Sequence, residues 1–150
     1  MEIELTVDKE QVMSQVAATT AYTGAKMEDE GALKRIPTVD EDEAHLLRFW
    51  EESRSDISQE LIELITYEGM APETTTYKLR LEVSRAFEDS VLPSMNLSLF
   101  SFFVYNITAK WYVYTNKGEA GDYADKAVTM LDDIHRKALY KKKPVRPTYN

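Results

Sequence analysis

The stretch that most constrains the fold is residues 93–115, PSMNLSLFSFFVYNITAKWYVYT. Its apolar side chains recur every three or four residues, which is the period of an α-helix. The stripe comprises Leu97, Phe100, Phe103, Val104, Ile107, Trp111 and Tyr114. Further apolar residues widen it, and a helix that is apolar on nearly all sides is buried on most of them. We therefore expect a central core helix around which the rest of the chain packs.

The same stretch could adopt two other structures, a membrane-spanning helix or a β-hairpin. It is long enough to span a membrane, but polar side chains such as Asn106 and Lys110 interrupt it. Such groups are costly in lipid, so we expect no contact with a membrane. Its second half is also rich in strand formers, and a β-hairpin turning at residues 116–118 is the alternative. Pro93, a residue that suits the first turn of a helix, favours the helix.

Two segments have the alternating apolar and polar residues of a strand with one face in water. They are residues 2–7 and residues 74–83. The inward side chains are Ile3, Leu5 and Val7 in the first segment, and Tyr77, Leu79, Leu81 and Val83 in the second. Two strands form a marginal sheet, so we expect them to pack on the helices. Pairing within the chain and pairing with a neighbouring copy both remain open.

Three further helices are predicted from apolar residues at helical spacing. The first follows Asp8, a good N-cap residue, and directs Val12, Val16 and Tyr22 inward. The second is the longest, at residues 40–67, and the third is at residues 119–140 with Ile134 and Leu139 inward. The short turn at 116–118 should make this last helix an antiparallel neighbour of the central one.

The predicted fold class is therefore mainly α, a bundle of about four helices with a small β element. Residues 27–37 are charged and end in a proline, so we expect a loop there. At this length one domain is expected, at residues 1–140. Residues 141–150 follow as an extended basic tail.

Charge divides the chain into two unlike halves. Residues 1–74 carry 18 acidic and six basic side chains, whereas residues 75–150 carry eight acidic and 12 basic ones. This asymmetry suits head-to-tail contact between copies or docking on a charged partner. Solvated faces of unequal sign are the alternative. The net charge of −8 argues against nonspecific binding of duplex DNA.

Two charged clusters are candidate interaction sites. Asp40, Glu41, Asp42 and Glu43 form the first turn of a predicted helix, where the helix dipole favours acids. They lack the alternating oxygen ligands and the glycine turn of a calcium loop. The second cluster is in the tail and consists of Lys141, Lys142, Lys143 and Arg146. These bases could bind phosphate or an acidic protein surface, or simply keep the C-terminus soluble.

No residue group indicates catalysis, a cofactor or a metal. Asp132 and His135 have the spacing of half a di-iron motif, but no second copy of that motif exists. The five glycines are scattered and form no phosphate-binding loop, and no serine sits in a nucleophile elbow. The chain has no cysteine, which excludes disulfides and thiolate metal sites. We therefore expect a protein that is not an enzyme.

Several motifs occur in a recognisable order. They are a connector FEDSVLP, an aromatic helix ending in KWYVYTNKGEA, and a last helix and tail DYADKAVTMLDDIHRKALYKKKPVRP. This order resembles the small head–tail connector or adaptor proteins, the neck proteins, of tailed phages and prophages of Bacteroides-type hosts. The resemblance covers most of the chain and is strongest at residues 77–147. The unusually acidic first half departs from the simplest connectors, which leaves open the neck ring to which it would belong.

The resemblance implies a structural virion protein located in the neck, and in the host cytoplasm during assembly. Such proteins form a ring, commonly of twelve copies, between the portal protein and the other neck or tail proteins. DNA passes through the ring only as cargo, and an acidic channel would let it slide. An extended terminus clasps a neighbour or the portal.

The alternative function is that of a soluble bacterial helical module for binding or regulation. Such a module could form a dimer through Leu47, Trp50 and Ile57, which share one side of the second predicted helix.

Overall fold

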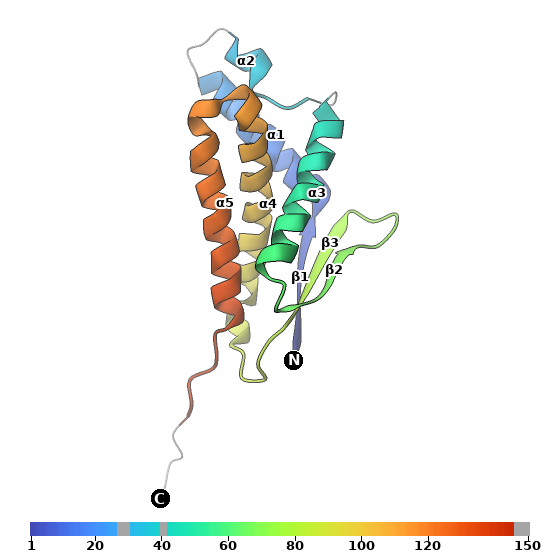
Figure 1. The fold of residues 1–150 in the computed structure, drawn as a ribbon, viewed down its shortest axis with the longest axis vertical. Coiled ribbons are helices and arrows are strands. Elements are labelled where there is room, and N and C mark those ends of the chain that lie inside the picture. The colour runs from blue at the N-terminus through green and yellow to red at the C-terminus, as the bar shows by residue number, and fades with distance from the viewer. Residues whose placement is uncertain (27–30, 40–41, 146–150) are drawn as a thin grey trace, which may run out of the picture.

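The computed structural model describes residues 1–26, 31–39 and 42–145, apart from the side chains of residues 33 and 34. The elements in chain order are β1 (Glu2–Asp8), α1 (Lys9–Lys26), α2 (Ala32–Arg35), α3 (Glu43–Glu60), β2 (Ile65–Met70), β3 (Thr76–Glu82), a 3-10 turn (Asp89–Val91), α4 (Leu92–Thr115) and α5 (Lys117–Ala138). Helix α4 lies in the middle, with α5, α1, α3 and strand β1 packed against it (Figure 1). The predicted fold class, mainly helical with a small sheet, is confirmed.

Helix α4 is the predicted core helix, and the alternative hairpin at its second half is wrong. Pro93 lies in its first turn, and Phe103, Ile107 and Tyr112 are fully buried. With the preceding turn, α4 is long and apolar enough to cross a membrane, a test that core helices of soluble proteins also pass. Leu97 and Tyr114 were predicted inward but are exposed, because the packing elements leave these parts of α4 uncovered.

Three aromatic rings join the helices to the sheet. Trp50 of α3 stacks on Phe103 of α4, with ring centroids 4.2 Å apart and planes at 16°. Tyr77 of β3 meets Phe103 edge-on at 5.1 Å and Trp50 edge-on at 5.9 Å. Aromatic pairs in these geometries add stability beyond the burial of their area. The three rings therefore fix the position of α3 and β3 against α4.

The sheet has three antiparallel strands in the order β1-β3-β2. The two predicted strands pair with each other within the chain, with Leu5 opposite Leu79. Strand β2 was not predicted, because the helix predicted at residues 40–67 includes its first residues, 65–67. That helix ends at Glu60, and β2 then pairs with the other edge of β3.

A salt bridge with two hydrogen bonds holds β2 to α3. Arg54 donates from Nε and Nη2 to the two carboxylate oxygens of Glu68, each at 3.0 Å. The hydrogen bonds and the charge of Glu68 raise the pKa of Arg54 despite its partial burial. The pairing of β2 with β3 shifts register between Ile65 and Tyr67, and such an irregularity hinders pairing of an edge strand with other chains.

Helix α1 begins where predicted. The Asp8 carboxylate accepts a hydrogen bond from the backbone N–H of Glu10 at 2.9 Å, as an N-cap residue does. Tyr22 is exposed, although it was predicted to point inward. The predicted loop at 27–37 is wrong in part, because residues 32–35 form the short helix α2, and residues 27–30 lie outside the described residues.

Helix α5 is the predicted antiparallel neighbour of α4, with only Asn116 between them. Ala138 is buried at its end, while Leu139, predicted inward, is exposed because the helix has ended at residue 138. The tail then crosses the connector that precedes α4. The N–H of Glu88 donates to the carbonyl of Tyr140 at 3.0 Å, and that of Lys142 to the carbonyl of Ala86 at 2.6 Å. The first residues of the predicted tail are thus held by the chain itself.

Candidate interaction surfaces

A groove lies between α1, the start of α3 and the β2–β3 turn, and we call it the α1–α3 groove. Its volume is about 680 Å³. Its apolar lining consists of Met13, Ala17, Val39, Leu46, Leu47 and Met70. Lys9, Glu10 and Glu43 are charged residues of the same groove. Val39 is 53% exposed and Leu47 is 38% exposed, so apolar surface is left open to water.

Specific hydrogen bonds shape this groove. The backbone N–H of Thr38 donates to the Oγ1 of Thr20 on α1 at 3.2 Å. The N–H of Val39 donates to the Asp42 carboxylate at 2.9 Å. Because these bonds attach the 38–39 segment to both α1 and the start of α3, the groove has fixed walls. The Lys9 ammonium group lies 5.6 Å from the centre of the Trp50 ring and links the groove to the aromatic core.

The predicted acidic cluster lies partly on this groove. Asp42 is the N-cap residue of α3 and accepts the hydrogen bond from Val39, so its role is at least partly structural. Glu43 is exposed and lines the groove. Asp40 and Glu41 lie outside the described residues. The sequence identified the acids but not the apolar groove, because its residues come from four separate segments.

The predicted basic cluster lies where the chain leaves the body, beyond α5. Lys141, Lys142 and Lys143 are all exposed, and Arg146 lies outside the described residues. We call residues 139–145 the C-terminal arm. It also carries exposed apolar side chains, since Leu139 is 58% exposed and Val145 is 92% exposed. Figure 1 shows the arm leaving the lower end of the molecule, away from the helices.

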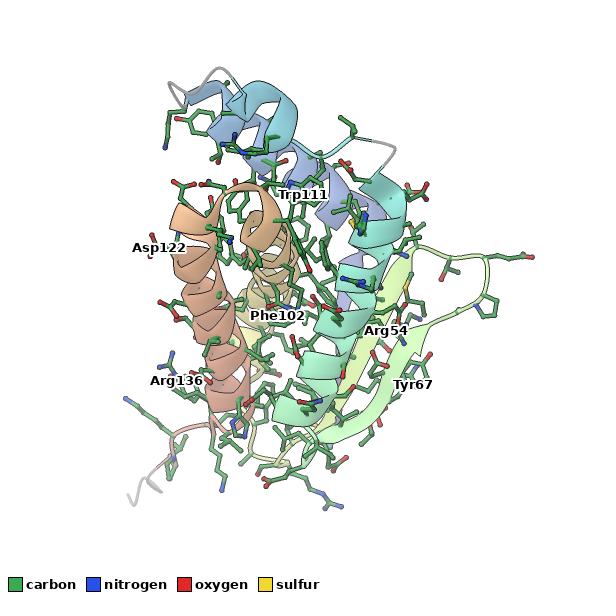
Figure 2. The ribbon with its side chains drawn as sticks, turned by 45° about the horizontal axis from the view of Figure 1, so that its top comes forward. Arg54, Tyr67, Phe102, Trp111, Asp122 and Arg136 are labelled. Carbon is green, nitrogen blue, oxygen red and sulfur yellow. The ribbon has the colours of Figure 1, made fainter. Side chains whose placement is uncertain are left out.

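A second, smaller groove of about 380 Å³ lies between α3 and α5, with α4 at its floor. Asp56, Glu60 and Asp132 line it together with Phe102, which Figure 2 labels on α4. Asn106 donates from its amide to Ser53 at 2.8 Å and to Asp56 at 3.0 Å. One of the three carboxylates thus has a partner within the chain.

The Asp132 and His135 pair does not form a metal site with other side chains. Both residues are exposed on α5, and no group of three or more potential ligands lies together within the described ranges. The neighbouring Asp133 accepts hydrogen bonds from Ser98 at 2.7 Å and from Arg136 at 2.9 Å. Desolvation raises the pKa of Asp133, but these bonds and the nearby Lys137 outweigh it and lower the pKa below 3.8.

The surface proposed for a dimeric helical module is not available. Trp50 and Ile57 are both fully buried in the core, and only Leu47 of the three residues is exposed. A dimer through this side of α3 would have to open the core, so the prediction of that particular interface is wrong.

No protein-family model matches the chain, and no curated protein or solved structure matches it either. The resemblance of its sequence to phage neck proteins therefore stays a prediction.

Proposed function

We propose that this chain is a non-enzymatic structural protein that assembles head to tail with copies of itself. Its role would be that of a head–tail connector, an oligomeric ring between the portal and the tail of a phage. The ring would contact the portal protein and other neck or tail proteins and would admit DNA only as passing cargo. This role comes from the sequence resemblance, and head-to-tail assembly is supported by the geometry described next.

One observation carries the assembly proposal: two unlike and uncovered surfaces lie at different ends of the molecule. The C-terminal arm presents three lysines and exposed apolar side chains beyond the end of α5. The α1–α3 groove lies at the opposite end of the bundle, along the first turns of α3 (Figure 1). A contact between two different surfaces is heterologous, and repeating it produces a ring if the rotation closes.

The test is the mass of the purified full-length chain, measured by mass photometry over a range of concentrations. We expect closed oligomers of defined size at low ionic strength and their loss as salt screens the charges. Deleting residues 141–150 should weaken assembly at least tenfold. A chain that stays monomeric at every concentration and salt, or oligomers unchanged by the deletion, would contradict the proposal.

Neutralising the acids provides an independent variant. Asp40→Asn, Glu41→Gln and Glu43→Gln together should weaken assembly more than they lower the melting temperature. The matched control is Glu63→Gln with Asp122→Asn and Asp125→Asn, three exposed acids away from the α1–α3 groove. Equal effects of the two sets on assembly would mean that only net charge matters.

A soluble binding module remains the second candidate, and the α3–α5 groove is the observation that favours it. A groove floored by Phe102 and lined by Glu60 and Asp132 could hold a basic segment of another protein. Gene order separates the two functions: neighbouring portal and capsid genes favour the connector, whereas a metabolic or regulatory operon favours the module.

A further inference from the structure

The α1–α3 groove has the character of a docking site. Its walls belong to α1, α3 and the segment that α1 holds in place, so it is preformed. Within it, the exposed surfaces of Val39 and Leu47 remain uncovered in the single chain. Contiguous apolar surface left in water marks an interaction site more often than scattered single residues do.

The C-terminal arm has the complementary character. Its apolar side chains, Leu139 and Val145, extend into solvent with no covering element among the described residues. Between them stand three exposed lysines, and Pro144 favours an extended backbone. An extended segment with an apolar anchor and positive charge suits a groove with an apolar floor and acidic residues at its edge.

Charge favours this pairing. The groove contributes Glu10 and Glu43, both exposed and without an ion pair to another described side chain within 4.0 Å. Lys9, the single base among the described residues that line the groove, is directed at the Trp50 ring. Lys141 to Lys143 would therefore meet acids and not bases.

The arm of the same molecule is badly placed to fill the groove. The hydrogen bond from Lys142 to Ala86 anchors the arm at the end opposite the groove. Val145 follows this anchor by three residues, so an extended chain places it at most about 11 Å from Lys142. Helix α3, whose first turns line the groove, is itself about 27 Å long for its 18 residues. Val145 therefore stays at the end opposite the groove of its own molecule.

We propose that the C-terminal arm of one copy docks in the α1–α3 groove of the next copy. Val145 packs against Leu47 and its apolar neighbours, and the lysines pair with Glu10 and Glu43. This inference rests on the proposed self-assembly and identifies the two surfaces that carry it. Because the surfaces differ, each copy both gives an arm and receives one.

Disulfide crosslinking tests the contact, since the chain has no cysteine of its own. The full-length variant Leu47→Cys/Val145→Cys, oxidised mildly, should give a ladder of covalent multimers on a non-reducing gel. Mixing the two single variants should give a dimer that contains one of each. The control is Ile62→Cys/Val145→Cys, because Ile62 is well exposed but lies outside the groove.

Each other outcome overturns the inference. A fast-migrating crosslinked monomer would place the arm in its own groove, and an equal ladder from the Ile62 control would mean nonspecific contact. No crosslink in variants that still assemble would leave the proposed function standing and remove this interface. No crosslink and no assembly would remove both.

Charge reversal gives a second readout that does not depend on cysteine. Lys141→Glu/Lys142→Glu/Lys143→Glu and Glu10→Lys/Glu43→Lys should each weaken assembly at least tenfold. Mixing the two variants restores opposite charges at every arm–groove contact, so assembly should return. Failure of the mixture to assemble, with both variants folded by circular dichroism, would contradict the pairing.

Discussion

The rings of Trp50, Tyr77 and Phe103 contact one another, and we call them the aromatic triangle. They lead to a prediction about stability. Phe103 of α4 contacts three rings, those of Trp50, Tyr77 and Phe102. Its neighbour Phe102 is also buried, but among the described aromatic rings it contacts only that of Phe103. Replacing each by leucine keeps an apolar side chain of similar size and removes the ring. The two substitutions therefore differ in how many aromatic pairs they break.

The magnitude follows from the pair count. An aromatic pair contributes about 0.5–1.5 kcal/mol beyond area burial, and a volume-conserving core change costs up to about 1.5 kcal/mol. Phe103→Leu breaks two pairs more than Phe102→Leu does, so it should lower the free energy of unfolding by about 1–3 kcal/mol more. Urea denaturation followed by tryptophan fluorescence measures this difference, with the slope m unchanged. Equal losses for the two variants would refute the role of the triangle.

Three smaller predictions follow. The folded-state pKa of Asp133 is below its ordinary 3.8, so its contribution to stability is complete at neutral pH and is lost as the pH falls through that lower value. Asp133→Asn should lower the melting temperature at pH 7 and make the melting temperature less sensitive to acid below pH ~4. The same fall of the melting temperature with pH in the variant and in the native protein would contradict this. Arg54→Lys cannot keep the two parallel bonds to Glu68 and should cost about 1–2 kcal/mol, with faster amide hydrogen exchange in β2. Gly121→Ala should stabilise the folded protein by about 0.5–1 kcal/mol, since nothing lies within 4 Å of the added Cβ. Gly24→Ala should destabilise it, because the added Cβ would lie 3.1 Å from the Ala32 carbonyl and the Pro37 ring. Thermal unfolding measures both effects.

The parts of the fold that the sequence predicts are those with strong local periodicity. Residues 92–115 and 117–138 show the helical spacing of apolar residues over many turns, and both are helices. Strand β3 follows from strict alternation, and Asp8 marks the boundary between β1 and α1. In each case the local pattern and the packing of the whole chain favour the same structure.

Strand β2 could not be predicted in this way. Ile57, Leu61 and Ile65 continue one helical stripe across the end of α3, and no proline or glycine interrupts it there. Pairing with β3 decides the conformation of residues 65–70. This pairing is a contact between two segments, and the apolar periodicity of one segment does not reveal it. Gly69 lies within β2 at φ 156°, a conformation that L side chains rarely adopt.

Only the charged residues of the candidate site could be predicted from the sequence. The sequence identifies Glu43 and Lys141–Lys143 as members of acidic and basic clusters, but the groove needs α1, α3 and the β2–β3 turn to meet in space. Leu47 carries no sequence signal that separates it from core residues, and only the fold shows that it is left exposed. Val145 falls in the predicted extended tail, but the sequence does not relate it to Leu47.

The most direct test of the central claim is the composition of purified virions from the source phage or induced prophage. Quantitative mass spectrometry would compare the amount of this chain with that of the portal protein. The connector role predicts that the chain is present at close to one copy per portal subunit. Its absence from the virions would contradict that role.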